Sequence, residues 1–163
     1  MADLTFTNDA TQRKAGTNLV PGKGDGQTVK AAICSTVELA ASASGVTVRL
    51  GRIPSNMRLL PTGLIYSDDL ATSGSPTLDV GLASVSSNIT SDPDAINNGL
   101  VLSSATTTTT VMADPANAGK RAWEFVNGQS TDPGGSLDVY ATVKDAATTA
   151  TGTVTVELYG YLD

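Results

Sequence analysis

The chain has 163 residues, a formal net charge of −6 and a pI of about 4.4, with no histidine and a single cysteine. This length is enough for one domain with a sizeable core that needs no disulfide scaffold. The acidic balance argues against a general nucleic-acid binder, and the lack of histidine removes the side chain most often used for proton transfer near neutral pH.

The first 28 residues show no sustained hydrophobic periodicity and are rich in glycine. Such a stretch cannot bury enough apolar surface to fold alone, so we predict an extended arm that becomes ordered only when another surface holds it. A leader without a role is the alternative. The segment GKGDG at 22–26 lacks the spacing and context of a phosphate-binding loop and is interpreted as a flexible hinge.

The opening MADLTFTNDATQRK contains no apolar segment typical of a signal peptide, and the chain has no run of about 18 apolar residues. We therefore expect a protein that is neither secreted nor inserted in a membrane, and that is made and kept in a cytoplasm. The sequon that begins at Asn88 is then expected to carry no glycan, because glycosylation requires secretion.

Hydrophobic alternation with a period of two starts at Val29 and predicts strands at 29–41, 46–50 and 57–66. Cys34 has no histidine to activate it and is interpreted as a small packed residue of the first strand. The third strand contains Pro61, which lacks a backbone donor and therefore predicts an edge position or a bulge.

A further strand is predicted at 78–82, after the turn-forming loop SDDLATSGSP. The segments SDPDAINNG at 91–99 and ADPANAG at 113–119 share an order of Asp, Pro and a later Gly. Asp is a good N-cap, Pro suits the first helical position and Gly suits a left-handed stop, so each segment predicts one or two helical turns. The threonines at 106–110 predict a loop or an edge strand.

In the last third of the chain, Trp123 and Phe125 share one face of a predicted short strand. Alternation then predicts strands at 137–143 and 154–158, which we interpret as an antiparallel hairpin. Seven or eight such strands predict an all-β fold. Specifically, we expect a two-sheet antiparallel β-sandwich, jelly-roll-like, over residues 29–163, preceded by the extended N-terminal arm at 1–28.

The residues offer little for catalysis, and we expect no enzyme, no cofactor and no metal site. Glycosidases need two carboxylates, which Asp68, Asp69, Asp79 and Asp138 could supply, but the single tryptophan and few other aromatics give little platform for a sugar.

Asp68 with Asp69, or Asp92 with Asp94, could bind Ca²⁺ through oxygen ligands, and this alternative stays open. Neither pair matches the EF-hand spacing, and we interpret them as carboxylates that fix a turn or cap a helical turn.

Surface residues are the better candidates for function. Arg49, Arg52 and Arg58 form a local basic patch that could meet carboxylates of a partner, although three solvated arginines are the alternative. Tyr140, Tyr159 and Tyr161 are predicted to project from the non-core faces of neighbouring strands, where exposed tyrosines favour interfaces. Packing beneath a loop or the arm is the alternative for these tyrosines.

The run VTVRLGRIPSNMRLLPTGLIYSDDLATSGSPTLDVGLA at 46–83, followed by AGKRAWEFVN, SLDVYATV and GTVTVELYGYL, resembles small structural proteins of tailed-bacteriophage virions. The resemblance spans most of residues 29–162, leaves out the arm and carries no catalytic signature. Proteins of this kind are often capsid decoration or cement proteins. They clamp the outer shell, commonly as trimers or dimers, and use arms to reach neighbouring subunits.

The resemblance implies a structural protein on the capsid exterior, assembled in the host cytoplasm, that bridges neighbouring major capsid protein subunits. It also implies a homo-oligomer, with a trimer favoured and a dimer possible. The expected capsid or subunit contacts are Arg13, Lys14, Lys23, Arg49, Arg52, Arg58, Tyr140, Tyr159 and Tyr161. Two alternatives are a virion spike or tail-associated module that binds a host surface glycan, and a glycoside or cell-wall hydrolase.

Overall fold

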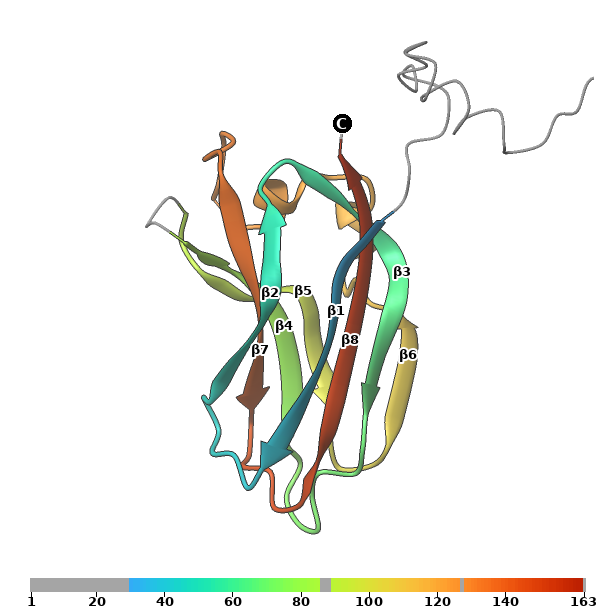
Figure 1. Cartoon of the computed structure of the whole chain (residues 1–163). Helices are drawn as coiled ribbons and strands as arrows, with labels where there is room; N and C mark the ends of the chain where they lie inside the picture. Colours follow the sequence, from blue (N-terminus) through green and yellow to red (C-terminus); the bar gives the residue numbers. More distant parts are fainter. Residues whose placement is uncertain (1–29, 86–88, 127, 163) are drawn as a thin grey trace, which may run out of the picture.

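The computed structural model describes residues 30–85, 89–126 and 128–162 (Figure 1). The predicted arm, with Arg13, Lys14, Lys23 and the GKGDG segment, lies outside the described residues, as does Asn88 of the sequon. The described elements are eight strands and two short 3₁₀ helices: β1 (Lys30–Ala40), β2 (Thr47–Pro54), β3 (Met57–Ser67), β4 (Thr77–Ser84), β5 (Asp92–Val101), β6 (Thr106–Thr110), η1 (Pro115–Asn117), η2 (Ala122–Phe125), β7 (Ser136–Lys144) and β8 (Thr151–Leu162).

The strands form two four-stranded antiparallel sheets that face each other (Figure 1). Sheet A has the order β1-β8-β3-β6 and sheet B the order β2-β7-β4-β5. Consecutive strands mostly alternate between the sheets, which is the strand order of an eight-stranded jelly roll. The prediction of a jelly-roll-like β-sandwich is confirmed.

The core lies between the sheets and follows the alternation of each strand. Val154, Val156 and Leu158 of β8 point inward and are buried, as are Leu137 and Val139 of β7. Full burial of one such side chain is worth about 1.5–3 kcal/mol, so the repeated inward positions account for much of the driving force for folding.

The predicted hairpin of the last two strands is wrong. β7 pairs with β2 and β4 in sheet B, whereas β8 pairs with β1 and β3 in sheet A. The connection at 145–150 therefore crosses from one sheet to the other. The apolar sides of β7 and β8 meet face to face across the core. The hydrophobic alternation in the sequence does not distinguish this packing from the pairing of the two strands within one sheet.

The two predicted helical turns have different outcomes. Pro115–Asn117 is the 3₁₀ helix η1, capped by the Asp114 carboxylate, which accepts a hydrogen bond of 2.9 Å from the N–H of Ala116. Asp92–Val101 is strand β5 instead, because Ile96 is buried and the backbone pairs with β4. Here tertiary pairing outweighs the local capping signals.

Three further predictions concern short elements. Pro61 lies where the register of β3 against β8 shifts, so the predicted bulge is confirmed. Thr106–Thr110 is an edge strand of sheet A, as expected. The predicted strand at Trp123 and Phe125 is wrong, because these residues form η2, where the Glu124 carboxylate accepts a hydrogen bond from the N–H of Arg121.

Among the described residues, the two helices are single 3₁₀ turns, and neither has the length or apolar character needed to cross a membrane.

Candidate functional site

A bulge in β2 determines where its arginines point. The register against β7 shifts between Arg49 and Gly51, and Leu50 and Ile53 both turn inward although they are three residues apart. In a regular strand, residues three apart lie on opposite faces, whereas the extra residue in this bulge places Arg49 and Arg52 together on the outer face of sheet B.

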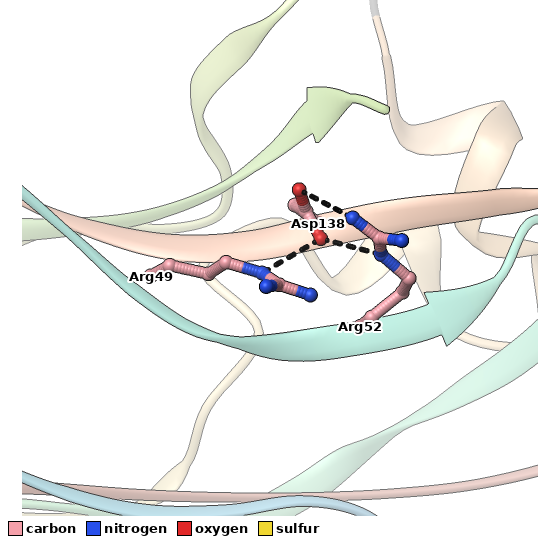
Figure 2. Close-up of polar contacts among 3 residues, drawn as sticks. All are labelled: Arg49, Arg52 and Asp138. Atoms are coloured by element: carbon pink, nitrogen blue, oxygen red, sulfur yellow. Dashed lines mark hydrogen bonds and ion pairs between the residues drawn. The ribbon is translucent and has the colours of Figure 1, made fainter. Parts of the chain in front are cut away.

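Both arginines bind the same carboxylate, that of Asp138 on β7 (Figure 2). The Nε of Arg49 donates to Oδ1 at 2.9 Å, and Arg52 donates from Nε to Oδ1 at 2.8 Å and from NH2 to Oδ2 at 3.2 Å. The hydrogen bond from Arg52 is the main cause that lowers the pKa of Asp138. Two guanidinium groups against one carboxylate leave one positive charge in excess.

This arginine–aspartate cluster is accessible from solvent. The side chains of Arg49 and Arg52 are 56% and 44% exposed, and that of Asp138 is 20% exposed. Exposed ion pairs contribute little to stability, since solvent screens them. The sequence did not predict the role of Asp138, because its partners lie more than 80 residues away and meet it only through the β2–β7 register.

Arg58 does not join this cluster. It lies on β3 in sheet A, where its side chain donates to the carbonyl of Gly119 and its backbone bridges to Arg121. The prediction of one patch of three arginines is therefore wrong in arrangement, since the turn between β2 and β3 passes from one sheet to the other.

The three candidate tyrosines are also divided between the sheets. Tyr140 is on β7 in sheet B, whereas Tyr159 and Tyr161 are on β8 in sheet A, so the predicted neighbouring strands are not neighbours. Tyr159 donates a 3.0 Å hydrogen bond to Glu157, which raises the pKa of the phenol. Burial, followed by the charges of Asp92 and nearby aspartates, raises the pKa of Tyr140.

One end of the sandwich holds the start of β1 and the end of β8, close together (Figure 1). Lys30 is paired with Gly160, and Met57 is paired with Leu162. Leu162 is 45% exposed, and Val46, Val85 and Val101 are the other large apolar side chains that the described residues leave exposed. Residues 1–29 join the sandwich at this end, which we call the β1–β8 end.

The carboxylates considered for catalysis are held by the protein itself. Asp68 accepts from the N–H and hydroxyl of Thr153 and from the hydroxyl of Tyr66, which together lower its pKa. Asp69 accepts from the N–H of Ala71, so the predicted turn-fixing role is confirmed. Asp79 is buried and accepts from the N–H of Gly99.

No group of three or more His, Cys, Asp or Glu side chains within 30–85, 89–126 and 128–162 is placed to hold a metal ion. The predicted capping role of Asp92 or Asp94 is wrong, because both belong to strand β5. The carboxylate of Asp94 instead accepts a 2.8 Å hydrogen bond from the side chain of Asn98.

A pocket of ≈ 280 Å³ lies beside β5, where the chain continues toward η1. The backbone of Ala113 is hydrogen-bonded to that of Ile96, which brings the 111–114 segment alongside this strand. Phe125 contributes a buried apolar wall, and the polar lining consists of Asp92, Asp94, Asn98, Asp114 and Asn117.

The interpretation of Cys34 as a packed residue is wrong. Its thiol is exposed on the outer face of sheet A, with Sγ 3.9 Å from a carboxylate oxygen of Glu157. Ile33 and Leu39 are the buried residues of β1, and Cys34 belongs to the opposite set of the alternation.

Comparison with known proteins identifies a shared fold. No protein-family model and no curated protein matches the chain. A solved structure described as the cyanophage Pam1 capsid asymmetric unit contains a chain with the same fold. The similarity covers 88% of this chain and 91% of that one, with a TM-score of 0.56 and 22% sequence identity.

Proposed function

We propose that this chain is a structural protein of a phage virion, which decorates the outside of the capsid and stabilises it by bridging neighbouring major capsid protein subunits. The observation that carries this proposal is the jelly-roll fold, shared over most of both chains with a component of a cyanophage capsid structure. The resemblance of residues 46–83 and the later strands to small virion proteins supports the same role.

The described surface favours a binding role over a chemical one. The four carboxylates considered above for catalysis are bound within the protein, by Thr153, by the N–H groups of Ala71 and Gly99, and by two arginines. A general acid or nucleophile must reach its substrate, and groups held in this way serve the fold instead. The protein would then act through contacts repeated over many copies, so that modest individual affinities give high avidity.

We place the capsid contact at the β1–β8 end. The exposed Leu162 and its neighbour Tyr161 lie at this end. Residues 1–29, which include Arg13, Lys14 and Lys23, precede β1 and are joined to the sandwich at the same end. An arm that becomes ordered on docking next to an exposed apolar side chain would extend the buried area at a single location.

Co-sedimentation with phage capsids assembled without this chain tests the proposal. The full chain is expected to sediment with the capsids and to raise the temperature at which they open. Removal of residues 1–25, or the substitution Leu162→Asp, is expected to reduce occupancy.

The matched control is Val46→Asp, which changes an apolar side chain of similar exposure beyond the opposite end of β1. If the full chain leaves the capsids in the supernatant, the proposed function is wrong. If it binds but Leu162→Asp and Val46→Asp behave alike, the assignment of the β1–β8 end is wrong.

A further inference from the structure

The two edge strands of sheet B carry opposite charges. At one edge, Arg49 and Arg52 of β2 leave an excess positive charge after pairing with Asp138. At the other edge, β5 and the segment before η1 supply Asp94 and Asp114 to the pocket. Strands β7 and β4 lie between these two edge strands. One chain therefore presents both charge clusters, one at each edge of the same sheet.

The arginine–aspartate cluster keeps hydrogen-bond donors available for a partner. Arg49 contacts Asp138 through Nε alone, and its two terminal nitrogens have no other partner in the described part of the chain. The same side chain is more than half exposed. A guanidinium group presents a planar fork of N–H donors that matches the geometry of carboxylates, so the outward side of Arg49 is suited to an acidic group.

The pocket has the complementary chemistry. The carboxylate of Asp94 accepts from Asn98, and that of Asp114 accepts from the N–H of Ala116, which leaves acceptor capacity on both. Phe125 adds a buried aromatic wall against which a planar cation can pack. A pocket lined by carboxylates and an aromatic side chain fits an arginine side chain better than an apolar or anionic group.

We propose that copies of this chain associate head to tail, with Arg49 of one copy entering the pocket beside β5 of the next. A second copy is the partner because a single sequence supplies both complementary surfaces, which its own fold keeps apart. Such an interface is heterologous, and it forms a closed ring when the rotation between copies returns to the first one. The inference goes beyond the proposed function and does not depend on a capsid.

Sedimentation velocity of the full chain without capsids tests the inference. The chain is expected to assemble beyond the monomer as concentration rises, and to assemble less as salt rises, since salt screens partly exposed charges. Arg49→Glu and Asp94→Arg are each expected to weaken assembly about tenfold or more. Combining Arg49→Glu and Asp94→Arg in one chain reverses both surfaces and is expected to restore assembly.

The matched control is Glu38→Arg, which makes the same charge change as Asp94→Arg at an exposed position of β1 in sheet A. It is expected to assemble as the original chain does. Circular dichroism checks that each variant is folded. If Arg49→Glu unfolds the chain through repulsion from Asp138, the milder pair Arg49→Gln and Asp94→Asn replaces the reversals, and each is expected to weaken assembly.

Three results would overturn the inference: a chain that stays monomeric at all concentrations, assembly that neither single variant weakens, or folded single variants whose combination fails to recover. If the milder substitutions Arg49→Gln and Asp94→Asn are used, assembly that neither of them weakens would also overturn the inference. A monomeric chain that still sediments with capsids would reject this interface and leave the proposed function standing.

Discussion

Thr153 of β8 donates two hydrogen bonds to Asp68, one from its backbone N–H at 2.8 Å and one from its hydroxyl at 2.9 Å. The hydroxyl of Tyr66 adds a third at 2.7 Å. Asp68 follows β3, so the carboxylate connects the end of β3 to the start of β8, its neighbour in sheet A. Donors to the ionised form favour it, which explains the lowered pKa of Asp68.

We predict that acid destabilises the fold chiefly through Asp68, and to a smaller extent through Asp138, whose arginine partners are exposed; the pKa values of both carboxylates are lowered. A carboxylate with a folded-state pKa below its unfolded value of about 3.9 contributes stability above that value. The contribution is lost as pH falls through the folded-state pKa. Thermal unfolding followed between about pH 6 and pH 2 is expected to show this loss.

The variant Asp68→Asn removes the titrating group and is expected to be less stable at pH 6, with a shallower loss of stability toward low pH. A melting temperature that falls equally steeply in both chains would show that Asp68 does not contribute to the acid sensitivity.

The core position Ile65 gives a second prediction. Ile65 is fully buried in β3, so Ile65→Ala removes packed apolar volume and is expected to lower the free energy of unfolding by about 2–5 kcal/mol. Chemical denaturation measures the change. Leu162→Ala is the control at an exposed position and is expected to change the free energy of unfolding by less than about 1 kcal/mol. Equal effects would contradict the placement of the core.

A third prediction concerns glycine at close backbone contacts. A Cβ added at Gly63 would meet the backbone carbonyl of Glu157 on the paired strand, whereas one added at Gly51 would meet the side-chain end of Ile33. A side chain can move aside more easily than a paired backbone. We therefore expect Gly63→Ala to lower the melting temperature more than Gly51→Ala does.

The exposed cysteine gives a fourth prediction. Because the thiol of Cys34 is exposed on sheet A, a disulfide reagent is expected to modify it in the folded protein at a rate close to that in denaturant. Absorbance of the released thiolate measures the reaction. Protection of several hundredfold in the folded state would contradict the exposed position and favour the packed position expected from the sequence.

The alternation in the sequence was enough to predict which side of each long strand is buried, as for Val154, Val156 and Leu158. It did not predict which strands pair. The apolar faces of β7 and β8 are buried equally well if the strands face each other across the core or pair within one sheet. The capping pattern succeeded at Asp114 and failed at Asp92, where pairing with β4 decides the conformation.

The sequence likewise predicted only part of the candidate site. Arg49 and Arg52 were chosen correctly as exposed side chains, but their common partner was not predicted, because it depends on the bulge in β2 and on its register with β7. A bulge changes the face of every residue that follows it. The signal for it in the RLGRIP segment is Gly51, because a glycine inside a strand often marks a bulge, and this signal was not used. The tyrosines were assigned to one surface for the related reason that β7 and β8 were taken as paired.

The place of β1 has a consequence for how the protein is made. Among the strands that the structure describes, β1 is the first in the sequence and has β8 as its single hydrogen-bonding neighbour. During translation β1 must wait until β8, more than a hundred residues later, has been made before it can pair, with its Ile33 and Leu39 still open to water. Sheet A is therefore completed only after β8 has been made, and conditions that slow synthesis between β1 and β8 lengthen the period in which this nascent chain can aggregate.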